Sequence, residues 1–175
     1  MGGLIGNYQI PYTTISEAIS IVTTVVNKYN GQLSRQSLAK ELAMNSKGGG
    51  FVNKLATIKS YGLLQGTSML MATDLAQKIV VSKDPAIVAR SKAEAFLKFT
   101  LYEQLFTRIR DKVPDDDALV NILVEITKAN RIEVSKKVTE IRKYYLDALQ
   151  YLKVIMDSGG LKEDQEVSRQ VQIPP

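Results

Sequence analysis

One stretch decides the fold of the first half of the chain: residues 34–64, SRQSLAKELAMNSKGGGFVNKLATIKSYGLL. Ser34 is a favourable N-cap, and Leu38 and Leu42 follow it four residues apart on one side of a short helix. Asn45–Ser46 ends this helix and begins a turn. The stretch therefore predicts two short helices joined by a turn.

The second of these helices is expected over residues 49–61. Phe51, Leu55 and Ile58 form one apolar stripe, and Gly62 is placed to end the helix. At 100° per residue the opposite face is small and polar, with Lys54 and Lys59 on its flanks. That face consists of Gly49, Asn53, Ala56, Thr57 and Ser60. Such a face suits the groove of a nucleic acid.

The flanking residues extend this pattern in both directions. Ser16 is a candidate cap for a helix over residues 17–29, which Asn30–Gly31 ends, and Gln32–Leu33 has the length of a very short strand. After Gly62, two apolar runs around Gln65–Ser68 predict a β-hairpin with a short loop. Thr73–Asp74 then caps another short helix.

This order of elements, with its KSYGLL ending and the later MATDLAQKIV, resembles the winged helix-turn-helix DNA-binding domain of prokaryotic and archaeal regulators. The resemblance covers residues 13–83. It implies that the recognition-helix role falls on Ser46, Lys47, Asn53, Lys54 and Thr57. It also implies phosphate contacts from the start of the preceding helix, at Ser34, Arg35 and Gln36. The hairpin loop QGTS departs from the family pattern because it contains no Arg or Lys.

The residues suggest a division of roles on duplex DNA. Asn53 and Thr57 are expected to face base edges in the major groove. Lys47, Lys54 and Lys59 are expected to contact phosphates, and Arg35 to anchor the first turn of its helix.

Net charge supports a polyanionic partner. The chain carries 23 basic and 18 acidic residues, a formal net charge of +5. Residues 1–84 hold eight basic and four acidic residues, whereas residues 85–175 hold fifteen and fourteen. Most of the excess positive charge therefore lies in the half that carries the helix-turn-helix pattern.

The chain has no cysteine and no histidine, which removes disulfides, thiolate nucleophiles, imidazole bases and the usual zinc ligands. We expect no enzyme activity, no cofactor and no metal. Gly48–Gly50 lacks the Lys-Ser/Thr ending of a phosphate-binding loop, so a flexible turn and a DNA-phosphate contact both remain open there. Asp115–Asp117 is interpreted as a helix cap rather than a magnesium site.

The second half of the sequence is predicted to be mainly helical as far as residue 157. Asp84–Pro85 begins a helical stretch that runs to about Arg110, with a break expected near Lys98–Phe99. Its aromatic stripe, expected in the core rather than stacked on bases, is Phe96, Phe99, Tyr102 and Phe106. A further helix follows Asp115–Asp117.

The last helix, expected over residues 131–157, has the clearest heptad pattern in the chain. Its apolar positions are Val134, Val138, Ile141, Tyr145, Ala148, Leu152 and Ile155. We expect this stripe to pair two copies of the chain, so that two recognition helices meet half-sites about one DNA turn apart. In a monomer the same stripe would be an internal core.

The predicted fold class is mainly α: a winged helix with a small β-hairpin, followed by an all-helical region with a long amphipathic helix. The expected domains are residues 1–83 for DNA binding, 84–157 for a helical dimerisation domain and 158–175 as a flexible tail. No apolar run is long enough to span a bilayer, so a cytoplasmic protein without membrane contact is expected.

The predicted function is binding of double-stranded DNA as a homodimeric transcriptional regulator or DNA-organising factor. The alternative is a protein-interaction module built on a winged helix, which docks a partner protein without binding DNA. The uncharged loop and the modest net charge favour this alternative somewhat.

Overall fold

A computed structural model describes residues 3–157 of the chain, except for the side chains of residues 154, 155 and 157. This part of the chain is mainly α-helical and contains eight helices and five short strands. None of the helices in residues 3–157 combines the length and apolar character needed to cross a membrane.

The first helix, α1 (Ile15–Tyr29), begins and ends at residues that explain its limits. The side chain of Thr14 accepts a hydrogen bond from the backbone N–H of Glu17, so Thr14 is the N-cap and the prediction of Ser16 was wrong. At the other end Asn30 adopts a left-handed conformation, as expected for the Asn30–Gly31 stop.

The next five elements follow the predicted order closely. They are β3 (Gln32–Ser34), α2 (Arg35–Glu41), α3 (Gly49–Ser60), β4 (Leu64–Gly66) and β5 (Met69–Ala72). The three strands form an antiparallel sheet in the order β3-β5-β4, with Leu33 opposite Leu70 and Gly66 opposite Leu70. Gly66 ends β4 with φ +102°, and a Cβ there would lie 2.0 Å from the Met69 carbonyl oxygen, so this position requires glycine.

The second half consists of helices, as expected. They are α4 (Asp74–Val81), α5 (Pro85–Lys98), α6 (Thr100–Ile109), α7 (Asp116–Thr127) and α8 (Arg131–Asp157). The chain breaks at Phe99, between α5 and α6, where the sequence predicted a break. Asp115 caps α7 by accepting a hydrogen bond from the Ala118 N–H, which confirms the capping interpretation of the aspartate run.

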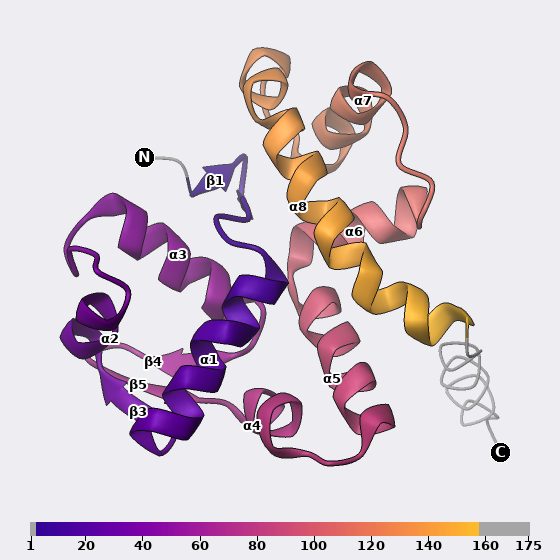
Figure 1. The fold of residues 1–175 in the computed structure, drawn as a ribbon. Coiled ribbons are helices and arrows are strands. Elements are labelled where there is room, and N and C mark those ends of the chain that lie inside the picture. The colour runs from indigo at the N-terminus through magenta and orange to yellow at the C-terminus, as the bar shows by residue number, and fades with distance from the viewer. Residues whose placement is uncertain (1–2, 158–175) are drawn as a thin grey trace, which may run out of the picture.

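Helix α1 separates two groups of elements: α2, α3 and the β3-β5-β4 sheet lie on one side, and α5, α6 and α8 lie on the other (Figure 1). One hydrophobic cluster nevertheless runs through both groups. It includes Val22 of α1, Ile58 of α3, Phe96 of α5 and Ile141 of α8. The division into domains at residue 83 stays a prediction, and the predicted tail, 158–175, lies outside the described residues.

The aromatic stripe of α5 and α6 lies in this core, as predicted. Phe96, Phe99 and Tyr102 are buried, and the rings of Phe99 and Tyr102 have centroids 4.5 Å apart. Tyr61, at the end of α3, donates its hydroxyl to the Thr13 carbonyl oxygen at 2.8 Å. Burial raises the pKa of Tyr61 and of Tyr102 well above the ordinary range, so both are neutral packing residues.

The predicted dimerisation stripe on α8 is packed inside the chain. Six of its seven residues are fully or almost fully buried: Val134, Val138, Ile141, Tyr145, Ala148 and Leu152. The side chain of Ile155 is outside the described part. Because α8 packs along α5 and α7, these six side chains have no surface for a second copy. Their predicted role in dimerisation is corrected to that of an internal core.

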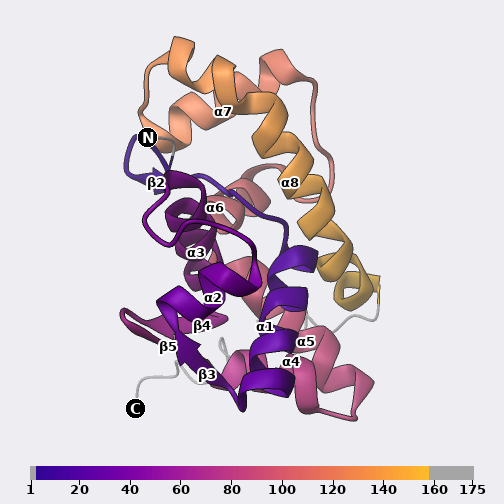
Figure 2. The same ribbon diagram turned by 60° about the vertical axis from the view of Figure 1, so that its left-hand side comes forward.

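An N-terminal hairpin was not predicted. Strands β1 (Leu4–Ile5) and β2 (Tyr8–Gln9) pair around Gly6 and Asn7, and Figure 2 shows the hairpin between α3 and α7. Gly6 has φ +55° and lies against Thr127 at the end of α7. The Gly-Asn pair between two short apolar and aromatic runs is a recognised hairpin signal, so the sequence did contain the information.

Candidate nucleic-acid interface

The outward face of α3 is rotated relative to the predicted one. Phe51, Leu55 and Ile58 point into the core, as expected. Gly49 and Val52 are exposed, and Ala56 and Lys59 are half-exposed; these four residues lie three or four positions apart along one side of the helix. Val52 is 41% exposed. We call these four residues the α3 face.

Thr57 does not belong to the α3 face, although it was predicted to read bases. Its side chain is fully buried, and its hydroxyl accepts a hydrogen bond from the Tyr12 N–H at 3.0 Å. The same hydroxyl donates to the Asn53 carbonyl oxygen at 3.0 Å. Both hydrogen-bonding functions of this hydroxyl are therefore used inside the protein.

Asn53 is also turned away from the α3 face. It is half-buried beside the N-terminal hairpin, where a Cβ added to Gly3 would come 3.1 Å from its Oδ1 atom. The predicted base contact of Thr57 is therefore wrong, and that of Asn53 stays a prediction. Residues 3–14 cover this side of α3, and no element was predicted for the first of these residues.

Lys54 pairs with an acid of α1 instead of pointing to solvent. Its ammonium forms an ion pair with Glu17, and its side chain is only 18% exposed. Burial raises the pKa of Glu17, but hydrogen bonds from Lys54 and Thr13 outweigh this and hold that pKa below its ordinary value. Glu17 is thus ionised at neutral pH, and the prediction of a free phosphate-binding Lys54 is corrected.

Arg35 joins three segments around the start of α2. Its Nε and Nη2 atoms each donate to the Ser46 carbonyl oxygen at 3.3 Å, and its guanidinium lies 5.5 Å from the centre of the Phe51 ring. Its backbone N–H donates to the Ser68 carbonyl oxygen at 2.9 Å. Arg35 therefore holds the α2–α3 turn against α3 and the hairpin loop, which is a positioning role.

The other predicted residues of this region differ in exposure and in the contacts that they make. The Ser34 hydroxyl caps α2 by accepting from the Ser37 N–H at 3.1 Å. Gln36 is exposed at the first turn of the same helix, and Ser46 is half-buried. Lys59 is half-buried, and its ammonium donates a hydrogen bond to the carbonyl oxygen of Gly66 in β4.

Lys47 is exposed immediately before α3, so it remains a predicted phosphate contact on the surface, as does the exposed Gln36. The α2–α3 turn is held by a hydrogen bond from the Lys47 N–H to the Asn45 side chain at 3.0 Å. Gly48 is the N-cap of α3 and offers no side-chain acceptor to the first amides of the helix. An anion beside Lys47 would therefore meet both an ammonium and helix N-terminal amides.

The segment of the chain that contains α2 and α3 is strongly one-sided in charge. Between Glu17 and Asp74 the sequence contains a single acid, Glu41, against six basic residues. The six are Lys28, Arg35, Lys40, Lys47, Lys54 and Lys59. Glu41 accepts hydrogen bonds from Tyr29 at 2.6 Å and Lys28 at 2.9 Å, and these bonds lower its pKa. No unpaired acid of this segment opposes an approaching polyanion.

The hairpin loop adds no charge to this surface. Residues 65–68 are exposed and uncharged, and the adjoining Met69 and Met71 are 51% and 40% exposed. Within residues 3–157 there is also no group of three acidic side chains placed to hold a metal ion.

Comparison with protein-family models, curated proteins and solved structures finds no match to this chain.

Proposed function

We propose that residues 13–83 form a winged helix that binds double-stranded DNA, with the α3 face in the major groove. The element order supports this proposal: helix, strand, two helices and a hairpin, with the first strand beside the hairpin. An α-helix fits the major groove of B-DNA, and the small residues of the α3 face allow close approach.

The observation that carries the proposal is the charge around α3. Between Glu17 and Asp74 six basic residues stand against one acid; Lys28 pairs with that acid and Lys54 with Glu17, which leaves Arg35, Lys40, Lys47 and Lys59 without a carboxylate partner in the described residues. Such a surface attracts phosphates and releases counterions when it binds them. Lys47 and the first amides of α3 are the best-placed phosphate ligands because no side chain of the described residues caps them.

The α3 face also indicates how the DNA would be bound. Val52 and Ala56 offer only apolar contact, for example to thymine methyl groups. Lys59 is the one cationic residue of the α3 face. Because the Thr57 hydroxyl is engaged inside the protein and Asn53 lies beside the N-terminal hairpin, few groups of the α3 face remain to read base edges. The proposal is therefore a DNA-binding protein with weak sequence preference, closer to a DNA-organising factor than to a sequence-specific regulator.

Fluorescence anisotropy with two duplexes of unrelated sequence tests this function. We expect both duplexes to bind with affinities within about threefold of each other, and both to weaken steeply as salt rises. Absence of binding at about 20 mM salt would reject the proposal, because electrostatic attraction is strongest there.

A second function is favoured by one observation. Val52, Met69 and Met71 are all substantially exposed, which is typical of a surface that docks another protein. In this alternative the segment is a protein-interaction module, and it does not bind duplex DNA at any salt concentration.

A further inference from the structure

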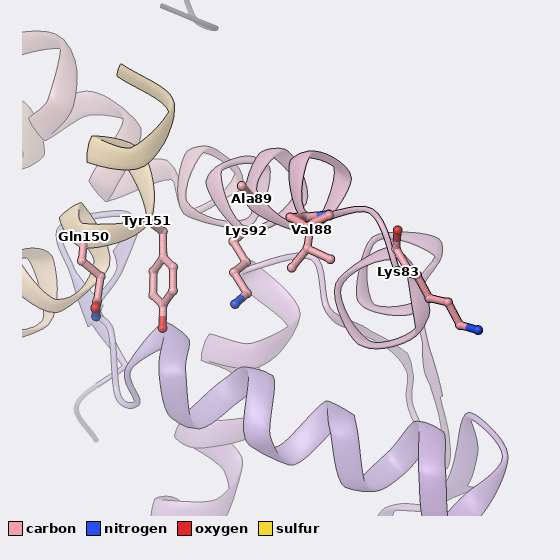
Figure 3. A pocket seen from close by; sticks show the side chains of 8 residues that line it. Lys83, Val88, Ala89, Lys92, Gln150 and Tyr151 are labelled. Carbon is pink, nitrogen blue, oxygen red and sulfur yellow. The ribbon is translucent and has the colours of Figure 1, made fainter. Parts of the chain in front are cut away.

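A cavity of about 440 Å³ lies on the opposite side of α1 from the sheet, between the α4–α5 turn, the first half of α5 and the last part of α8. Figure 3 shows the side chains that shape it: Lys83, Val88, Ala89, Lys92, Gln150 and Tyr151. Its volume is within the range of pockets that hold small organic molecules. Neither the predicted DNA contacts nor the predicted dimer seam includes these residues.

The lining combines an apolar wall with positive charge. Val88 and Ala89 form the wall on α5, and Lys92 lies one turn further along the same helix. The Lys92 ammonium is 5.6 Å from the centre of the Tyr151 ring, and Figure 3 shows both side chains pointing the same way, toward the start of α1. No acidic side chain lines the cavity, and within residues 3–157 neither Lys83 nor Lys92 forms an ion pair.

We propose that this cavity binds a small amphipathic monoanion, such as an aromatic or aliphatic carboxylate. Lys92 would pair with the carboxylate, and the apolar wall and the Tyr151 ring would cover the organic body. The Tyr151 hydroxyl is paired with Ser16 at 2.6 Å and the Gln150 amide donates to Asp147 at 3.3 Å, so the Lys92 ammonium is the polar anchor for the ligand. A cationic ligand is disfavoured because the Lys92 ammonium lies beside the Tyr151 ring and no acid lines the cavity; the Lys83 side chain extends away from these two residues (Figure 3).

Tyr151 also connects the cavity to α1. Its hydroxyl lies 2.6 Å from the Ser16 hydroxyl in the first turn of α1. The next residue, Glu17, forms the ion pair with Lys54 of α3. A ligand that moves Tyr151 therefore shifts the first turn of α1, which carries the Glu17 carboxylate paired with Lys54. This coupling rests on the proposed DNA binding, whereas anion binding by the cavity does not.

Calorimetric titration of the full chain with phenylbutyrate and with its neutral amide tests the site. We expect the carboxylate to bind about three- to fivefold more tightly than the amide, the effect of one partly exposed ion pair. Lys92→Met should abolish this preference, and Ala89→Trp should block both probes by filling the cavity. The matched control, Lys136→Met on the exposed side of α8, should change neither affinity.

Two results would overturn the site: absence of binding by the carboxylate, or a preference for it that survives Lys92→Met. Because Lys92 is a half-exposed residue, its replacement leaves the core intact, and the test of the site does not depend on how Ala89→Trp folds.

The coupling has its own test. We expect saturating phenylbutyrate to change the affinity for duplex DNA by about twofold or more in the wild type. Tyr151→Phe should retain phenylbutyrate binding but lose this response, because the variant lacks the hydroxyl that meets Ser16. A response that persists in Tyr151→Phe overturns the coupling. A chain that binds phenylbutyrate but no DNA contradicts the proposed function and the coupling, and supports the site.

Discussion

Glu17, in the first turn of α1, forms an ion pair with Lys54 of α3. This pair removes Lys54 from the positive surface and places a negative charge beside it. We expect Glu17→Gln to raise the affinity for duplex DNA about two- to fivefold at low salt, because it releases Lys54 and removes one repulsive charge. Anisotropy titrations measure this change. Glu125→Gln, which breaks the Arg108–Glu125 pair at 2.9 Å elsewhere in the protein, is the matched control.

The same pair sets a small pH effect on stability. Because the pKa of Glu17 is lowered in the folded protein, its stabilising contribution is present above the ordinary glutamate pKa and is lost as pH falls through the lowered value. An exposed pair of this kind contributes about 0–1 kcal/mol to the free energy of unfolding.

The affinity measurement on Glu17→Gln also has a contradicting outcome. An unchanged affinity for duplex DNA would show that Lys54 plays no part in DNA binding even when its ion pair is removed.

Lys47 is the exposed lysine beside the start of α3, and its loss should weaken DNA binding regardless of sequence. We expect Lys47→Ala to reduce the slope of log affinity against log salt by about 0.9, the effect of one lost phosphate contact. Lys136→Ala, an equal loss of charge on α8, should leave that slope unchanged. Equal slopes in wild type and Lys47→Ala would remove Lys47 from the interface.

The α3 face should not tolerate a negative charge. Val52 is exposed at the centre of that face, so Val52→Glu should preserve the fold and reduce DNA affinity at least about tenfold through repulsion and lost contact. Ile132→Glu, at a position 67% exposed on α8, provides the control. If Val52→Glu binds DNA as the wild type does, another surface is responsible.

Gly6 should be the critical glycine of the N-terminal hairpin. A Cβ at this residue would lie 2.3 Å from the Thr127 carbonyl oxygen, and φ is +55°. We expect Gly6→Ala to lower the free energy of unfolding by about 1–3 kcal/mol, measured by urea titration.

Gly49 has no atom within 4 Å of its Cβ position and lies in the first turn of α3. Gly49→Ala should therefore stabilise the protein by about 0.5–1 kcal/mol.

Asp147 on α8 should reduce stability at neutral pH. Burial raises its pKa, hydrogen bonds from Ser16 offset this in part, and its Oδ2 atom is buried without a partner in the described residues. The cost exists while the carboxylate is ionised and disappears as pH falls through the raised pKa. We expect Asp147→Asn to stabilise the protein by about 1 kcal/mol at pH 7 and to remove this pH dependence. Thermal unfolding across pH, with Asp111→Asn as an exposed control, provides the measurement; an equal response in both variants would contradict the assignment.

The elements of this fold could largely be predicted from local signals. Ser34 as a cap, Asn30 as a stop and the Phe99 break all depend on residues within one turn of the feature they determine. The apolar stripe of α3 was predicted for the same reason.

The orientation of side chains between elements could not be predicted in this way. Thr57 was assigned to the exposed face because a helical wheel does not include residues 3–14, which cover that side of α3. The heptad stripe on α8 has the same spacing whether it packs against a second copy or against α5 and α7 of its own chain. Long-range contacts decide both questions.

The central claim, that the α3 face and Lys47 contact duplex DNA, is tested most directly by following the amide NMR signals of the full chain during titration with a short duplex. We predict the largest shifts at residues 47–52, at Ala56 and Lys59, and in the hairpin loop at residues 65–68. Shifts concentrated on α7 and α8, or no shifts at a saturating excess of DNA at low salt, would contradict the account.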